Sequence, residues 1–291
     1  MITHPCCKIN LGLRVLRRRA DGYHDLETLF LPVASLHDTL EITPLDAPSA
    51  LFSATGLPVD GDAADNLCLK AYRLLRADFP QLPAVHIRLH KAIPMGAGLG
   101  GGSADAAYTL RMLDSLFALA LTPAQLHAYA ARLGADCPFF VTAAPALAQG
   151  VGDDLTPLAG NPLQGLHLLI AKPTVSVSTR EASSHIQCHP HAAGTLAAAA
   201  DSLAQGVADK GHRLRQLADV LVNDFEAAIF PRHPAVAQLK ADFYQQGADF
   251  AAMSGSGAAV YALFSEQERC RSAYTTLEAS HPEYFFHITY F

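Results

Sequence analysis

The segment P-M-G-A-G-L-G-G-G-S, residues 94–103, is the most biased stretch of this chain and decides how its first half folds. The alternating residues 85–90 before it predict a strand, and residues 104–120 after it, rich in Ala and Leu without Gly or Pro, predict a helix. A glycine-rich loop that opens into a helix presents unobstructed backbone amides and the positive end of the helix dipole. We therefore expect an anion site suited to a polyphosphate.

Two familiar nucleotide loops fit this segment less well. Residues 96–101 match G-x-G-x-x-G, but Pro94 and Met95 separate the match from the strand, whose one face is polar. A Walker A loop needs a lysine that the segment lacks. A flexible linker is disfavoured because a strand and a long helix flank the run tightly. Ser103 is interpreted either as a helix N-cap or as a hydroxyl ligand of phosphate-bound Mg²⁺, and the two roles are compatible.

The composition describes a compact globular protein. Half of the 291 residues are hydrophobic, 16% are charged and the net charge is −6, which excludes a disordered chain and argues against a nucleic-acid partner. The six cysteines lack paired spacing, as expected for reduced thiols. Neither a signal peptide nor an apolar run of roughly 18 residues is found, so we expect a cytoplasmic protein without a membrane partner.

The remaining elements follow from periodicity and turn residues. Residues 8–15 alternate strictly and predict a half-buried strand, and Asp21-Gly22 predicts a tight turn in which both residues supply positive φ angles. Helices are expected from Asn66 and from Thr122, the second delivering residues 135–138 into a turn. The later expectations are a buried strand at 166–171, a helical or mobile segment at 192–205, and a domain boundary that divides the chain into residues 1–155 and 156–291.

Three motifs in order resemble those of the GHMP kinases. Residues 94–107 look like the phosphate loop of that superfamily, and K-I-N-L-G-L at 8–13 and S-G-S-G-A-A-V-Y at 254–261 resemble its other two motifs. The resemblance covers almost the whole chain and implies an α+β fold of two domains, the first ribosomal-protein-S5-like α/β and the second ferredoxin-like α+β. It also implies ATP and Mg²⁺ as cofactors. The residues implied in ATP binding are Asn66, Lys91, Pro94, Met95, Gly96, Ala97, Gly98, Leu99, Gly100, Gly101, Gly102, Ser103 and Ala104, with Ser103 also the metal ligand.

Within the superfamily, R-A-D-G-Y-H at 19–24 and L-G-A-D-C-P-F-F at 133–140 resemble the diphosphocytidyl-methylerythritol kinases. The resemblance implies transfer of the ATP γ-phosphoryl group to the 2-hydroxyl of the methylerythritol moiety, a small-molecule substrate linked to cytidine diphosphate. Asp136 would accept the hydroxyl proton and Lys8 would polarise the hydroxyl and neutralise the transferring charge. The implied substrate-binding residues are Asn10, Tyr23 against the cytosine face, His24 at its polar edge, Phe30 and Thr179.

Several alternatives stay open on the residues alone. Lys8 also fits a solvated strand lysine, and Asp136 a turn or cap carboxylate. Ser183 stands where the subfamily usually has an aromatic residue, so either one face of the cytosine is open or His185 compensates. The histidines at 185–191 match no standard zinc spacing.

The alternatives for the whole chain are a mevalonate or homoserine kinase, a catalytically silent nucleotide-binding paralogue, and a nicotinamide-dependent oxidoreductase that rests only on the G-x-G-x-x-G match. All three residues whose loss would favour the silent paralogue, namely Lys8, Ser103 and Asp136, are present. The expected assembly is a monomer or a weak homodimer.

Overall fold

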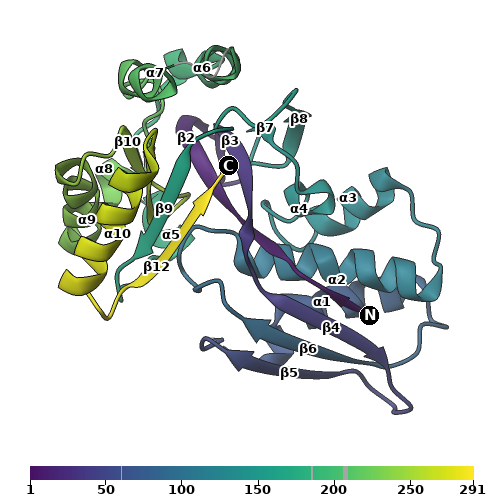
Figure 1. Ribbon diagram of the computed structural model, residues 1–291. Coiled ribbons are helices and arrows are strands. Elements are labelled where there is room, and N and C mark those ends of the chain that lie inside the picture. The colour runs from purple at the N-terminus through teal and green to yellow at the C-terminus, as the bar shows by residue number, and fades with distance from the viewer. Residues whose placement is uncertain (60, 185, 206–208) are drawn as a thin grey trace. The chain divides into compact units, whose positions relative to one another are not determined.

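A computed structural model describes residues 1–59, 61–184, 186–205 and 209–291, with the side chains of residues 179, 180, 184 and 191 outside the description. The chain forms two compact units (Figure 1). Unit 1 consists of Met1–Lys8, Pro32–Met95 and Gly100–Ala144, and unit 2 of Ile9–Leu31, Gly96–Leu99 and Pro145–Phe291. Each unit therefore draws on separate stretches of the chain, while the boundary after residue 155 stays a prediction.

Unit 1 is built on a four-stranded sheet in the order β1-β4-β6-β5, in which β5 and β6 are parallel and the other pairs antiparallel. The strands are β1 (Ile2–Thr3), β4 (Thr39–Pro44), β5 (Leu51–Gly56) and β6 (Val85–Lys91). The helices are η1 (Ala63–Asp65), α1 (Leu67–Asp78), α2 (Gly101–Phe117), α3 (Pro123–Ala131) and α4 (Phe139–Thr142).

The core of unit 1 lies between this sheet and the helices α1 and α2 (Figure 1). Alternation in β6 turns Val85, Ile87 and Leu89 into the core, where Leu75 of α1 and Leu110 of α2 cover them. The strand predicted over 85–90 is thus confirmed. Its last residue, Lys91, brings the chain directly to the glycine-rich loop.

Unit 2 contains an antiparallel sheet in the order β10-β11-β9-β12. Its strands are β9 (His167–Lys172), β10 (Phe250–Met253), β11 (Val260–Phe264) and β12 (Phe285–Tyr290). Helices α9 and α10 pack on one face of the sheet through Leu239, Phe243 and Leu277 (Figure 1). The helices are α5 (Thr179–Ser184), η2 (Pro190–Ala192), α6 (Thr195–Ala204), α7 (Lys210–Gln216), α8 (Glu226–Ile229), α9 (Pro234–Gln245) and α10 (Gln267–Ser280).

A third sheet has the order β2-β3-β7-β8, with strands β2 (Cys6–Arg18), β3 (His24–His37), β7 (Ala146–Gln149) and β8 (Asp154–Pro157). The prediction that residues 8–15 form a half-buried strand is wrong in one respect, because residues 6–13 are buried on both faces of β2. Leu13 and Val15 join the core cluster of unit 2. The other face of the strand carries the polar Lys8 and Asn10, and both side chains are buried. Burial of polar side chains on a strand requires specific partners, and these define the site described below.

Most expected elements are confirmed with shifted ends. The helix expected over 104–120 runs from Gly101 to Phe117, because Gly100 at φ +72° closes the loop and Ala118 at φ +49° ends the helix. Thr122 caps α3 with a capping box, and the expected strand at 166–171 corresponds to β9. Of the two alternatives given for 192–205, helical or mobile, the helical one is found in α6. In the tight turn at 21–22 only Gly22 has a positive φ, so the expectation for Asp21 was wrong.

The fold class predicted from the sequence, α+β, is confirmed. Among the described residues no helix is both long and apolar enough to cross a membrane.

Candidate active site

Lys8 and Asp136 form a close pair within unit 1. The Lys8 ammonium lies 3.3 Å from Oδ2 of Asp136, and the side-chain exposures are 3% for the lysine and 35% for the aspartate. The interpretation of Lys8 as a solvated strand lysine is therefore wrong. The pair combines a buried cation with a carboxylate that still reaches solvent, which is the arrangement needed to receive a proton beside a developing negative charge.

The start of α2 lies close to the Lys8 side chain. A Cβ at Gly100 would lie 2.8 Å from the Phe140 ring and 3.2 Å from Cε of Lys8, so only glycine allows these side chains to approach the helix start. The turn that carries Asp136 is held by Cys137, whose N–H donates to the Gly134 carbonyl at 3.1 Å. The catalytic candidates and the N-terminus of α2 thus occupy one corner of unit 1.

The first turn of α2 has the features of an anion site. Gly100 is the N-cap and offers no side-chain acceptor, so the amides of Gly101, Gly102 and Ser103 have no partner in the helix itself. The N-cap role weighed for Ser103 is wrong, because Ser103 occupies the third helical position. Burial raises the pKa of the Cys137 thiol to about 12, against the opposing effect of a hydrogen bond with Ser103. The Ser103 hydroxyl, only partly buried, fits the predicted Mg²⁺ role, and the three amides that lack an intrahelical partner fit the phosphates of ATP.

In unit 2 the middle of the glycine-rich loop lies against the turn between β10 and β11. The amides of Ala258 and Ala259 donate to the carbonyls of Gly96 and Ala97 at 3.0 and 3.1 Å, and the Ser254 hydroxyl donates to the Gly98 carbonyl at 3.0 Å. A Cβ on Gly98 would lie 1.9 Å from the Ser254 carbonyl oxygen, so this approach requires glycine. The segment that contains the S-G-S-G motif therefore holds the loop by hydrogen bonds to three of its carbonyl groups. Its serine was not among the predicted site residues.

Lys91 has a different environment from the one expected for an ATP ligand. It is 2% exposed, and its ammonium contacts Oδ2 of Asp38 and, at 2.9 Å, Oδ2 of Asp105 in α2. Asp38 also accepts from the amides of Ala92 and Ile93 at 2.6 and 2.8 Å. Burial works to lower the pKa of Lys91, but the two carboxylates together raise it. The triad joins the end of β6 to α2, and a direct contact of Lys91 with ATP stays a prediction.

The same triad makes Asp105 an unusual carboxylate. Burial raises the pKa of Asp105 to about 7, with the Lys91 ammonium opposing the rise and Asp38 adding to it. Among the described residues its Oδ1 has no hydrogen-bond partner. Because the pKa is higher in the folded state than in the unfolded chain, the stabilising contribution is complete below about pH 4 and is lost as the pH rises through about 7.

We expect Asp105→Asn to flatten the pH dependence of stability. In the native protein this group should lower the free energy of unfolding, on the order of 1 kcal/mol per pH unit, as the pH rises from about 4 to about 7, and Asn cannot ionise. Urea unfolding at pH 5 and pH 7 measures the slope. Asp65→Asn, at an exposed carboxylate of the same unit, is the control and should leave the slope unchanged. Equal slopes in wild type and Asp105→Asn would contradict the assignment.

Tyr23 and His24, the residues implied in cytosine recognition, lie at the hairpin between β2 and β3. Tyr23 is 64% exposed, and burial together with the Arg18 charge lowers the pKa of His24, which favours a neutral imidazole. A neutral imidazole can both donate and accept, as reading a base edge requires. The exposed ring and the neutral imidazole are compatible with the predicted roles, which stay predictions.

The other predicted substrate residues are less accessible. Asn10 is buried, and its amide donates to Thr28 Oγ1 at 3.0 Å. Phe30 is buried in β3, so little of its ring is available to a ligand. The Thr179 side chain lies outside the described residues, as does His185, so neither its predicted contact nor compensation for Ser183 is tested. Asn66 caps α1 by accepting from the Cys68 amide at 2.9 Å, and its contact with ATP stays a prediction.

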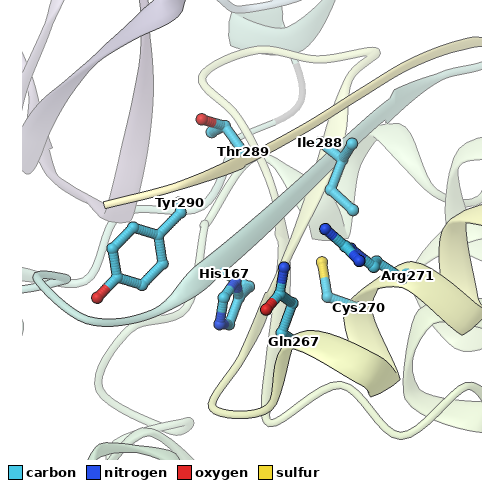
Figure 2. A pocket seen from close by; sticks show the side chains of 7 residues that line it. All are labelled: His167, Gln267, Cys270, Arg271, Ile288, Thr289 and Tyr290. Carbon is cyan, nitrogen blue, oxygen red and sulfur yellow. The ribbon is translucent and has the colours of Figure 1, made fainter.

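A cavity of about 610 Å³ lies elsewhere in unit 2 (Figure 2). None of the predicted site residues lines it. Its lining residues are His167, Gln267, Cys270, Arg271, Ile288, Thr289 and Tyr290, from β9, α10 and β12. Among the residues that the structure describes, no group of three or more His, Cys, Asp or Glu side chains is placed to hold a metal ion.

Comparison with known proteins gives consistent matches along the chain. The model of the GHMP kinases N terminal domain matches residues 66–144, and that of the GHMP kinases C terminal matches residues 198–280. A protein of Bacteroides thetaiotaomicron named 4-diphosphocytidyl-2-C-methyl-D-erythritol kinase is 46% identical over 92% of this chain and 93% of its own length. A protein of the same name from Porphyromonas gingivalis is 42% identical over 95% of this chain and 96% of its own.

Solved structures agree with these matches. The crystal structure of a 4-(cytidine 5′-diphospho)-2C-methyl-D-erythritol kinase superposes with a TM-score of 0.76 at 33% identity, covering 96% of both chains. Homoserine kinase from Cytophaga hutchinsonii shares the fold, with a TM-score of 0.71 at 17% identity over 98% of this chain and 94% of its own. The chain belongs to the GHMP kinases, and within them to the family of 4-diphosphocytidyl-2-C-methyl-D-erythritol kinases. It is a small-molecule kinase with the two-domain α+β fold of that family.

Proposed function

We propose that this protein transfers the γ-phosphoryl group of ATP to the 2-hydroxyl of 4-diphosphocytidyl-2-C-methyl-D-erythritol, a step of the methylerythritol phosphate route to isoprenoids. The observation that carries the proposal is the Lys8 and Asp136 pair, 3.3 Å apart, beside the glycine-rich start of α2. The choice of substrate is supported by the names of relatives that match this chain over most of their own length. The free thiols of all six cysteines support a reducing compartment such as the cytoplasm.

The proposed mechanism assigns one role to each group. Asp136 takes the proton of the 2-hydroxyl as its oxygen bonds to the γ-phosphorus, and the bond from that phosphorus to the bridging oxygen of ADP breaks. The Lys8 ammonium stabilises negative charge on the attacking oxygen and on the phosphoryl group. The amides of residues 101–103 and the dipole of α2 hold the phosphates. Mg²⁺, held through Ser103, would neutralise charge on the phosphates when bound.

Burial gives the Lys8 charge its strength in this mechanism. An ammonium that is almost completely removed from water acts through a lower effective dielectric than an exposed one, so its effect on nearby charge is larger. Asp136, one-third exposed, keeps the access that an incoming hydroxyl group needs. The pair therefore combines a fixed charge with an accessible base.

The decisive assay offers the protein Mg-ATP and three alcohols in parallel: the cytidyl substrate, mevalonate and homoserine. We expect turnover of the cytidyl substrate with kcat/KM at least about 10²-fold above the other two, because buried polar groups left unpaired by a wrong substrate penalise it. Preferred turnover of mevalonate or homoserine would reassign the substrate. ATP binding without turnover of any alcohol would instead favour a catalytically silent paralogue. Binding of NAD(P) would favour a nicotinamide-dependent oxidoreductase.

A further inference from the structure

We propose that Arg19 and Asp21 are positioning residues that hold the exposed Tyr23 ring in place for a cytidine nucleotide. The inference rests on the proposed function for the role of Tyr23. The backbone of the turn, an ion-pair network across it and the exposure of the ring support the inference, and all of them lie within unit 2.

The turn backbone is held at both ends. The Arg19 amide donates to the Tyr23 carbonyl at 2.8 Å, and the Gly22 amide donates to the Arg19 carbonyl at 3.2 Å. The Tyr23 amide donates to Oδ1 of Asp21 at 3.1 Å, which makes the Asp21 side chain part of the turn. Gly22, at φ +89°, allows the chain to reverse directly before Tyr23. Two contacts thus fix the peptide that carries the ring.

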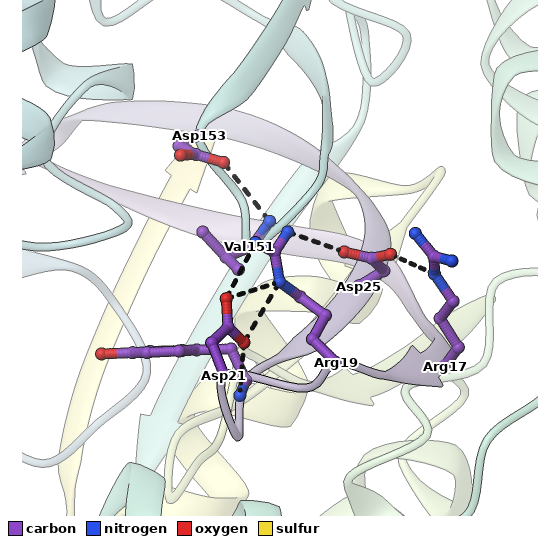
Figure 3. A network of polar contacts seen from close by, with 7 residues as sticks. Arg17, Arg19, Asp21, Asp25, Val151 and Asp153 are labelled. Atoms are coloured by element: carbon purple, nitrogen blue, oxygen red, sulfur yellow. Dashed lines mark hydrogen bonds and ion pairs between the residues drawn. The ribbon is translucent and has the colours of Figure 1, made fainter.

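Arg19 holds Asp21 in this position with a two-point contact (Figure 3). Its Nε lies 3.2 and 3.0 Å from the two carboxylate oxygens of Asp21, and a terminal nitrogen lies 2.9 Å from Oδ2. Its other terminal nitrogen donates to Asp25 in β3 at 3.1 Å. Hydrogen bonds from Arg19 lower the pKa of Asp21, so its carboxylate stays ionised at neutral pH. A planar guanidinium suits this geometry better than a lysine ammonium.

The contact between Arg19 and Asp21 is expected to contribute little to folding, which points to a local purpose. Exposed ion pairs add little to stability, and Arg19 and Asp21 are 40% and 48% exposed. Tyr23 itself is 64% exposed, so the backbone of residues 21–23, more than side-chain packing, sets the direction in which its side chain leaves the turn. A ring held in place before binding saves the ordering cost that a mobile ring would add to the complex. We call the exposed ring of Tyr23, with the turn that carries it, the platform. Its expected ligand is a pyrimidine nucleotide that stacks on the open face of the ring.

Two variants separate the network from general damage to the hairpin. Arg19→Ala removes the contacts with Asp21 and Asp25. Arg17→Ala removes a comparable charge from the same hairpin, and among the described residues the ion pair of Arg17 is with Asp25 and not with Asp21. We expect Arg19→Ala to raise KM for the cytidyl substrate about 3- to 10-fold without a change in kcat or in KM for ATP. Arg17→Ala should leave all three constants within about twofold of wild type. Arg19→Lys should restore only part of the loss, because an ammonium lacks the planar fork with which Arg19 contacts Asp21 and Asp25 together.

A binding measurement with cytidine 5′-diphosphate, by calorimetry, tests the inference without turnover. We expect Tyr23→Ala to weaken binding about 10- to 100-fold, and Arg19→Ala to have no further effect in the Tyr23→Ala background. Equal effects of Arg19→Ala and Arg17→Ala, or a loss in kcat alone, would overturn the positioning role. In another outcome, the protein binds cytidine diphosphate through Arg19 and Tyr23 and yet does not turn over the cytidyl substrate. That result would reject the proposed function but support the platform. Binding that does not depend on Tyr23 would overturn the positioning inference, whereas turnover of the cytidyl substrate would still decide the proposed function.

Discussion

Asp136→Asn is expected to lower kcat for the cytidyl substrate by about 10²–10⁴-fold, the range that removal of a general base covers in other enzymes. The amide keeps the shape of the carboxylate but cannot accept the hydroxyl proton. The affinity for Mg-ATP should stay within about twofold, because the phosphates are assigned to the amides at the start of α2. Steady-state ATP consumption gives kcat, and nucleotide titration gives the affinity.

The control for this variant is Asp65→Asn, which removes an exposed carboxylate from the same unit. It should leave kcat unchanged. Because Asp136→Asn deprives the buried Lys8 of its partner, thermal unfolding of both variants separates a loss of fold from a loss of chemistry. A kcat within tenfold of wild type, in a folded variant, would mean that Asp136 is not the base and that the turn carboxylate has a structural role.

Local patterns predicted the elements around the site well. Five glycines and a following alanine-rich run specify a loop and a helix through backbone preferences alone, and α2 begins three residues before the expected start. Thr122 likewise predicts its helix because a capping box is a contact between residues three positions apart. Signals of this kind depend only on neighbours in the sequence, so tertiary packing shifts their ends without removing them.

Contacts between distant residues were beyond this kind of prediction. Asp38, the partner of Lys91, lies 53 residues earlier in the chain, in no motif that singles it out. Ser254 approaches Gly98 across 156 residues, and only the S-G-S-G pattern marked that segment. The family resemblance implied Lys91 in ATP binding, and the structure places two buried carboxylates beside its ammonium. A sequence gives the charge of a buried residue but not the partner that neutralises it.

The alternation of β2 shows the same limit in another form. A period of two indicates that the two faces of a strand differ in polarity, and solvent is the commonest reason. In β2 both faces are buried, and the polar face carries Lys8 and Asn10. Only the resemblance to a kinase family suggested that the polar face lines a site. The burial of Lys8 is therefore the structural finding with the largest consequence for mechanism.

The consequence can be tested with Lys8→Met, which keeps most of the buried stem and removes the charge. We expect kcat to fall about 10²–10³-fold, as for loss of one preorganised electrostatic group, because the attacking oxygen would lose the ammonium that the proposed mechanism assigns to it. Lys70→Met, at an exposed lysine of the same unit, is the matched control and should behave as wild type.

The double variant with Asp136→Asn distinguishes a shared role from two separate ones. If Lys8 and Asp136 act together on one hydroxyl, the loss in the double variant should be close to that of Asp136→Asn alone, since groups that act as a unit are strongly non-additive. Losses that multiply would assign Lys8 to the phosphoryl group and Asp136 to the alcohol as independent contributions. Because the two groups are only 3.3 Å apart and one is buried, we expect the non-additive result. Full activity of Lys8→Met would contradict any catalytic role for the lysine and leave it as the structural partner of Asp136.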